Sequence, residues 1–381
     1  MKQKLFLAAM AAIAMTSCSN DETLEINTGT ERAIDFRTAM ATRATETTTA
    51  NLDKFYVTAF NENKLNFPYF ENLEFKRTEA EEEGESTYFT SEDRYYYPGD
   101  GSSLTFYAYA PSATDLRTSV DTDNANKNLT LKDFSPAKEI SEQVDFITAN
   151  ATGSKEDADA GVDLKFAHRL SQIEIKGKSE NTSYDFEVKG IRIGKVCSKG
   201  SFDFKNGTWE LSEDEDVDVA IYEKVYADDA EPTKLSAEAT SFMAGDNAML
   251  LPQRLDAWQP QDLDNTNKKA YLSVLVRVTT KAGALVYPFN GDERDYAWAA
   301  IPVGIEWEAG KKYVYTLDFT TGAGFVDPTE DENKGESVIT GEIKFTVDVE
   351  AWSESEEEVE VPRDPNLDID EEDVDDPFGG E

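Results

Sequence analysis

Residues 338–352 read VITGEIKFTVDVEAW, and the second half of this stretch decides the fold class. Polar residues there alternate with apolar ones, which stand at Ile343, Phe345, Val347, Val349 and Ala351. Because the side chains of a β-strand point alternately to its two faces, this pattern predicts a strand with one buried face and one solvated face. Antiparallel sheets commonly have one such solvated face, so the stretch favours an antiparallel sheet.

The same alternation recurs along the chain, with turn residues between the apolar segments. Residues 270–279 and 311–319 each place apolar or aromatic side chains at alternate positions. Residues 104–110 (LTFYAYA) are apolar or aromatic on both faces and are flanked by Pro98-Gly99-Asp100-Gly101 and Pro111, which is typical of a central strand covered on both sides. No long segment has helical periodicity, so the sequence predicts an all-β fold of antiparallel β-sandwiches.

Residues 162–175 interrupt this regularity. Their apolar residues stand at even positions up to Leu170 and at odd positions afterwards, and a β-bulge near Ser171-Gln172 would restore a single inward face. His168, the only histidine of the chain, shares the apolar face. Because no nucleophile-elbow motif accompanies it, we expect a core histidine and no catalytic triad.

The composition makes several classes of function improbable, namely nucleic-acid binding and the common zinc sites. The chain has 381 residues and a formal net charge of −40, so its surface would repel nucleic-acid phosphates, and no nucleic-acid partner is predicted. A single histidine excludes the common multi-histidine zinc sites, and no metal or other cofactor is predicted. Carboxylates are abundant enough to keep a hydrolase with paired acids as a minor alternative to a solvated acidic surface. Residues 121–126 begin like a calcium loop but lack its glycine and distal Glu, which leaves calcium binding by the acidic loops open.

The first residues have the features of a secretory signal. Two lysines precede an apolar segment at 5–15 that is too short to span a bilayer, and Met15-Thr16-Ser17-Cys18 resembles a lipobox. We therefore predict a signal peptide at 1–17 and attachment of acyl chains such as palmitate to Cys18. The alternative is an ordinary signal peptide with an incidental cysteine. With Cys18 lipidated, Cys197 has no disulfide partner and is expected to be a small buried hydrophobe.

Composition shifts divide the chain into five predicted parts. They are a signal peptide (1–17), a lipidated polar tether with a candidate plug strand (18–50), an N-terminal β-sandwich (51–160), a C-terminal β-sandwich (161–352) and an acidic tail (353–381). The tail has fourteen acids against one arginine and is predicted to be disordered. The acids directly after Cys18 resemble the signal that sends Bacteroidales lipoproteins to the outer surface of the outer membrane.

Six short patterns follow one another along the chain. They are Thr42-Arg43-Ala44-Thr45 in the predicted tether, Tyr96-Tyr97-Pro98 leading to 104–111, FAHRLSQI at 166–173, MLLPQ at 249–253, WEAGKKYVY at 307–315, and IKFTV at 343–347 closing at Trp352. In this order they give the chain a resemblance to the fimbrillin family, the lipoprotein subunits of Bacteroidales type V pili. One departure is Tyr97, which stands where tryptophan often precedes this proline in the family.

The resemblance implies two transthyretin-like β-sandwiches in tandem and a mode of assembly. An arginine-specific or trypsin-like protease would cut the tether. The lipid and the first strand would then leave the chain, which would open a groove that a strand of another pilus subunit fills. On this sequence the cut falls best between Arg43 and Ala44, with Arg32 and Arg37 as competitors. The candidate plug strand is Ala33–Phe36, with Ile34, Asp35 and Phe36 entering the groove.

The tail and an exposed aromatic cluster keep several roles open. Only Val359 and Val361 alternate after Trp352, so the tail makes a poor donor strand, which favours a tip adhesin or accessory subunit. Leu367 and Ile369 could extend a weak donor and keep a stalk subunit open. The rival function is a permanently lipid-anchored surface protein that binds glycans or host ligands through tyrosines 95–97. Both functions place the protein at the outer membrane surface, and a pilus subunit would also be found in the fimbrium. No enzyme activity is predicted for either.

Overall fold

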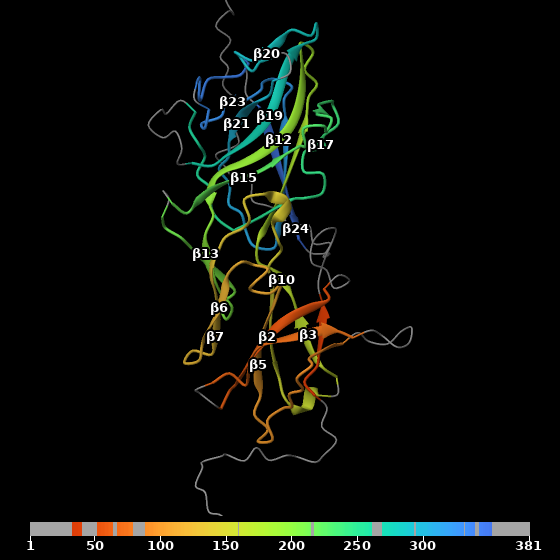
Figure 1. Ribbon diagram of the computed structural model, residues 1–381, viewed down its shortest axis with the longest axis vertical. Coiled ribbons are helices and arrows are strands. Elements are labelled where there is room, and N and C mark those ends of the chain that lie inside the picture. The colour runs from red at the N-terminus through yellow and green to blue at the C-terminus, as the bar shows by residue number, and fades with distance from the viewer. Residues whose placement is uncertain are drawn as a thin grey trace, which may run out of the picture.

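The computed structural model describes residues 33–39, 52–63, 67–78, 88–158, 160–214, 217–260, 269–292, 295–330, 332–339 and 343–352. Within these ranges the chain forms strands β1 to β24, two single-turn 3-10 helices and no α-helix, which confirms the all-β prediction. The molecule is elongated, with the strands of the first third of the chain at one end (Figure 1). In the described part, no helix has the length and apolar character needed to span a membrane.

Sheet I has eight strands and curls on itself, so that residues of its own strands line one core. Aromatic residues dominate this core, because Phe side chains recur on the inner face of successive strands. In spatial order its strands are β10 (Ala167–His168), β8 (Ile147–Gly153), β5 (Leu104–Ala110), β2 (Lys54–Asn61), β3 (Phe70–Arg77), β4 (Phe89–Thr90), β1 (Phe36–Ala39) and β9 (Val162–Lys165).

Sheet II covers the other face of sheet I. Its strands are β14 (Thr208–Leu211), β13 (Gly200–Asp203), β7 (Asn128–Phe134) and β6 (Ser119–Asp123). Tyr107 and Tyr109 point from β5 into the core shared with sheet II, whereas Phe106 and Ala108 point into the core of sheet I. Strand β5 is therefore covered on both faces and has the predicted bounds, which confirms its assignment as a central strand.

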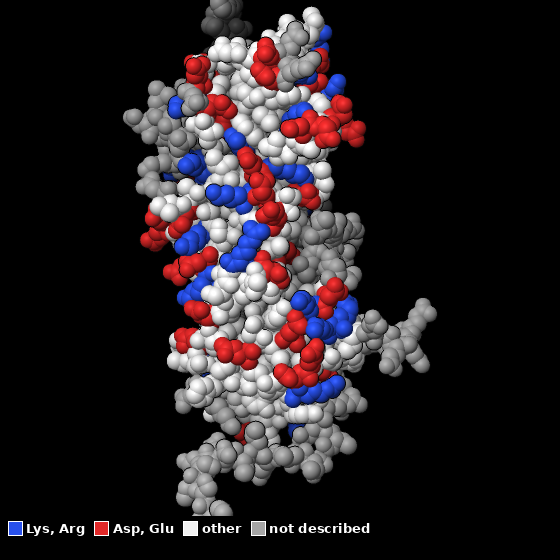
Figure 2. Space-filling view, viewed as in Figure 1, with Lys and Arg blue, Asp and Glu red and all other residues white. Residues whose placement is uncertain are grey.

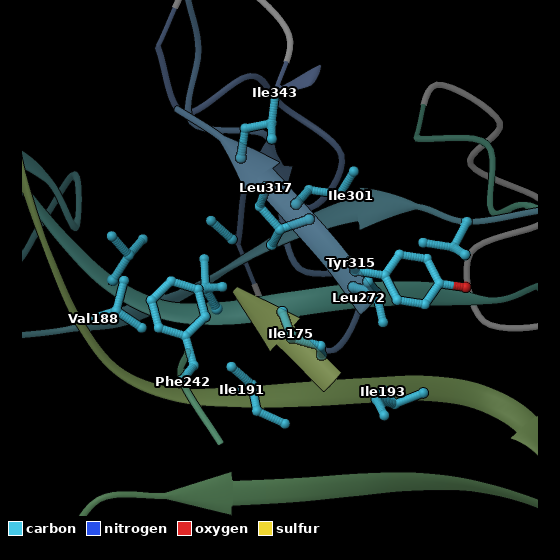
Figure 3. Packing of buried hydrophobic residues seen from close by; sticks show 14 of the residues in the cluster. Ile175, Val188, Ile191, Ile193, Phe242, Leu272, Ile301, Tyr315, Leu317 and Ile343 are labelled. Carbon is cyan, nitrogen blue, oxygen red and sulfur yellow. The ribbon is translucent and has the colours of Figure 1, made fainter. Parts of the chain in front are cut away.

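Sheets III and IV pack face to face around the largest core. The side chains of Ile175 and Leu317 from sheet III meet those of Ile191 and Leu272 from sheet IV (Figure 3). Sheet III contains β17 (Thr240–Ser241), β11 (Ser171–Lys178), β22 (Lys311–Asp318), β24 (Lys344–Ala351) and β18 (Ala248–Leu250). Sheet IV contains β15 (Val219–Val225), β12 (Tyr184–Cys197), β19 (Tyr271–Thr280), β21 (Ala297–Pro302), β23 (Phe325–Val326), β16 (Thr233–Lys234) and β20 (Leu285–Tyr287).

The sheets cross the predicted boundary at residue 160. Strands β9 and β10 lie after this residue but pair with β1 and β8 of sheet I. Strand β13 pairs with β7, which joins the two sides of the boundary within sheet II. The division of the chain into sandwiches at 51–160 and 161–352 therefore stays a prediction.

The predicted β-bulge near Ser171-Gln172 is wrong. The chain leaves sheet I after His168 and enters sheet III at Ser171, so the change of parity marks a switch between sheets. A bulge does occur in β12, between Gly194 and Val196. Because it shifts the inward face, Val196 is buried and Cys197 is only half-buried, contrary to its expected burial.

Strand β24 carries the alternation from which the fold class was predicted. It pairs with β22 in an antiparallel ladder, and Val347 and Val349 pack against the large core. The strand lies at an edge of sheet III, so Phe345 keeps 36% of its surface exposed. The sheets are not wholly antiparallel as expected, because β1 runs parallel to β9 and β11 runs parallel to β22.

His168 is a core residue, as predicted. Its Nδ1 lies 2.8 Å from Oδ2 of Asp145, and its ring stacks on Trp352 with a centroid distance of 4.1 Å. All three side chains are buried. The histidine therefore ties sheet I to the end of β24 through a buried polar pair and a ring contact, which is a structural role.

Charges on the outer face of sheet IV are locally balanced. Lys and Arg side chains lie among Asp and Glu side chains across the visible face (Figure 2). Arg192 on β12 pairs with Glu223 on β15, and Arg277 on β19 pairs with Glu187 on β12. These part-buried pairs prevent this face from forming a patch of a single sign.

Candidate strand-acceptor site

Strand β1 comes from the N-terminal part of the chain and is seated inside sheet I. It pairs with β9 in a parallel ladder that runs from Phe36 opposite Val162 to Ala39 opposite Lys165. On its other side Phe36 pairs with Phe89 of β4 in the antiparallel sense. Residues 40–51 connect β1 to β2 and lie outside the described residues.

Two further backbone hydrogen bonds hold the residues just before β1. The amide of Ile34 donates to the carbonyl of Tyr95 at 2.8 Å, and the carbonyl of Asp35 accepts from the amide of Val162 at 3.1 Å. Residues 33–35 therefore bind to the neighbouring backbone without being part of a regular ladder. For this reason the strand begins at Phe36, three residues later than the predicted Ala33–Phe36.

Phe36 is the main hydrophobic anchor of β1. Its side chain is 0% exposed, and its ring lies 4.8 Å from Phe75, 5.1 Å from Phe106 and 6.0 Å from Phe55, each in an edge-to-face arrangement. These rings come from β3, β5 and β2, so side chains from three strands surround the single side chain of Phe36 on β1. Edge-to-face contacts add to the stability gained by burying the ring.

Alternate residues of this segment face opposite directions. Ile34 is 2% exposed and belongs to the same core as Phe36, whereas Asp35 between them is half-buried. Arg37 reaches outward and pairs with Asp163 of β9 at 3.0 Å. The segment therefore presents apolar residues to the core and charged residues to the rim of the sheet.

Burial raises the pKa of the Asp35 carboxyl, and the positive charge of Arg94 partly opposes this increase. A carboxyl in the unfolded chain titrates at its ordinary pKa, so the folded state favours the protonated form. Ionisation of Asp35 therefore destabilises the folded state. This destabilisation is absent at pH values below the pKa of the unfolded chain and grows as the pH rises through the higher pKa of the folded chain. At neutral pH the ionised carboxylate of Asp35 therefore opposes the seating of β1.

Asp35→Asn is expected to raise the free energy of unfolding at pH 7 by about 0.5 kcal/mol, a small value because solvent screens a part-exposed group. The gain should disappear near pH 3, where the wild-type carboxyl is protonated in both states. Urea denaturation at the two pH values measures the difference. Asp121→Asn on the exposed part of β6 is the control and should change neither value, and a variant at position 35 that is less stable at pH 7 would contradict the account.

The position of β1 determines what its loss would do. Among the residues that the structure describes, β1 is the single ladder neighbour of β9, and β4 has β1 on one side. Without β1, backbone groups of both strands would lack partners, and the rings around Phe36 would face a groove. An extended peptide can satisfy such groups by β-strand addition, so the site is able to accept a strand.

The structure places only part of the predicted site. It places Ile34 and Phe36 in the core of sheet I and Asp35 at its rim, and Phe36 and Arg37 lie within β1. Cys18, Arg32, Arg43 and Ala44 lie outside the described residues. Sequence reasoning missed the residues that receive the strand, because Phe75, Phe106 and Val162 are distant in sequence. The apolar patterns around Phe106 and Val162 predicted strands but not their partners, and no strand was predicted around Phe75.

The tyrosine cluster considered for glycan binding lies beside this site. Tyr95 packs on Phe70 at 5.0 Å and Tyr97 is buried, so both belong to the core and its edge. Tyr96 is 41% exposed, and its carbonyl accepts a hydrogen bond from the Tyr69 hydroxyl. One exposed ring therefore stays available as a stacking surface.

In the calcium-like loop at residues 121–126, the Asp123 carboxylate accepts hydrogen bonds from the backbone amides of Ala125 and Asn126, as in a turn.

Layered sheets around separate apolar cores define an all-β sandwich protein. A model of the fimbrillin-like family matches residues 42–352, and the chain belongs to this family. The chain is 28% identical over 245 residues to the fimbrium subunit Fim1C of Phocaeicola vulgatus, a match that covers 55% of this chain and 62% of that relative. A fimbrial protein from Bacteroides vulgatus ATCC 8482 has a similar fold, with a TM-score of 0.55 and 18% identity over 84% of this chain and 100% of that chain.

Proposed function

We propose that this chain is a non-enzymatic fimbrial subunit that is exported as a lipoprotein on Cys18 and assembled by protease-triggered strand exchange. Membership of the fimbrillin-like family and similarity to a fimbrium subunit support a fimbrial role. Before cleavage, acyl chains on Cys18 hold the chain at the outer membrane surface. After cleavage, a strand of another pilus subunit takes the place of β1, and the mature chain serves in cell adhesion.

One observation carries this proposal, namely that the N-terminal strand is seated inside sheet I and that its covalent connection to β2 runs through residues 40–53. A cut at Arg32 would leave β1 on the mature chain. The backbone at Arg37 is paired with β9, which keeps it from a protease that needs an extended, accessible segment. A cut after Arg43 separates the whole strand from the rest of the chain and also removes the lipid.

The second candidate function is a permanently anchored lipoprotein that binds glycans, and the exposed ring of Tyr96 favours it. Mechanical shearing of native cells separates the two functions. A fimbrial subunit should appear in the sheared fibre fraction together with other subunits, and Tyr96→Ala should leave its amount unchanged. Recovery only in detergent extracts of the membrane, with glycan binding that Tyr96→Ala abolishes, would contradict the fimbrial proposal.

The acidic tail bears on the place of the subunit in the fibre. A donor strand must present apolar side chains at alternate positions, and Val359 and Val361 are embedded among glutamates. A strand this acidic would bury charge or make little contact. The composition of residues 353–381 therefore favours the role of a tip or accessory subunit, which accepts a strand, over that of a stalk subunit, which must also donate one.

A further inference from the structure

We infer that the strand that replaces β1 belongs to a different protein and carries an aromatic residue at the Phe36 position, two residues after an aliphatic one. This inference rests on the proposed function, because it concerns the strand that enters the groove after β1 has left. It specifies the chemistry of the partner, which strand exchange by itself leaves undefined.

The requirement for an aromatic side chain follows from the floor of the groove. Phe36 is enclosed by Phe55, Phe75 and Phe106, whose planes lie at 70°, 81° and 86° to its own. These three rings belong to β2, β3 and β5 and stay in the chain when β1 is removed. An alanine at this position would leave a cavity, and a leucine would fill part of it but lose the edge-to-face contacts.

The aliphatic requirement follows from the period of the segment. Ile34 lies two residues before Phe36 and is almost fully buried in the same core. The residue between them faces the rim, where Asp35 is half-buried, so its identity is less restricted. The outward pair of Arg37 and Asp163 is largely exposed and contributes little selectivity.

Residues 353–381 do not provide such a strand. Their alternating pairs are Val359 with Val361 and Leu367 with Ile369, and neither contains a ring. Their one aromatic residue is Phe378, and Asp376 stands two positions before it. Residues 353–381 of a second copy would therefore leave the Phe36 pocket unfilled, which favours a strand of different sequence.

Strand exchange on the full chain tests this inference. A recognition site for a sequence-specific protease, inserted between residues 42 and 45, allows the chain to be nicked while β1 stays bound. Fluorescent peptides then compete for the site: residues 33–39 (AIDFRTA), the same peptide with Phe36→Leu or Phe36→Ala, and residues 355–361 (SEEEVEV) of the tail. Fluorescence polarisation at equilibrium reports the amount of each peptide bound.

The expected order of affinity follows from the packing. Relative to AIDFRTA, the Phe36→Leu peptide should bind about 10-fold more weakly, and the Phe36→Ala peptide should bind more weakly by a factor of about 100 or more. The tail peptide should not displace AIDFRTA from the nicked chain. Equal binding of the leucine or alanine peptide, or competition by the tail peptide, would overturn the inference and leave strand exchange intact. Failure of AIDFRTA itself to enter the nicked chain would instead reject strand exchange at this site.

Discussion

Phe36→Ala is expected to lower the free energy of unfolding by about 3–5 kcal/mol, the largest stability effect that we predict for any single substitution in β1. The alanine would leave a cavity between Phe55, Phe75 and Phe106 and would remove three edge-to-face contacts. Because β1 is the one ladder neighbour of β9 among the described residues, the amides of β9 that donate to the β1 segment, such as that of Val162, should also lose protection. Urea denaturation and hydrogen exchange measure the two effects.

Phe67→Ala is the matched control, because Phe67 is 78% exposed and lies outside the strands of sheet I. Exposed substitutions away from special features usually change stability by less than about 0.5 kcal/mol. The amides of β9 should keep their protection in this variant. A Phe36→Ala protein as stable as the control, with unchanged exchange in β9, would show that the strand is not anchored through this ring.

Arg43→Ala is expected to stop maturation and to reduce the amount of the chain in sheared fibres to background. Proteases that select arginine recognise its guanidinium group, which alanine lacks. The variant chain should stay in the membrane fraction with its lipid on Cys18 and with β1 attached. Gel mobility of the surface protein and its amount in the fibre fraction are the two measurements.

Arg32→Ala is the control for Arg43→Ala, because a cut at residue 32 would leave β1 in place. This control should mature and enter fibres like the wild-type chain. The account would be contradicted if Arg43→Ala chains assembled normally. A loss of assembly in the Arg32→Ala chain would place the functional cut before β1, and β1 would then belong to the mature subunit.

Local periodicity was sufficient to predict several elements of this fold. Strand β24 follows from the alternation of eight residues, which the pleat of a single strand determines, and strand β5 follows from a seven-residue run that is apolar on both faces. Such features depend on neighbours in the sequence, so a single chain is enough to identify them.

The pairing of distant strands could not be predicted in this way. The parallel ladder between β1 and β9 joins segments more than a hundred residues apart, and nothing in either segment indicates the other. The change of parity after Leu170 is equally compatible with a bulge and with a switch of sheets, because both move an apolar face by one residue. No sequence pattern indicated the bulge between Gly194 and Val196 in β12, which leaves Cys197 only half-buried.

The intact mass and N-terminal sequence of the protein recovered from the native cell surface test most directly whether β1 is released. We expect a mature chain that begins at Ala44 and carries no lipid, because release of β1 is the step that opens the groove. A lipidated chain that still begins at Cys18 would rule out assembly by release of β1. In that case β1 would stay in sheet I, and the chain would be an anchor or a ligand-binding surface lipoprotein.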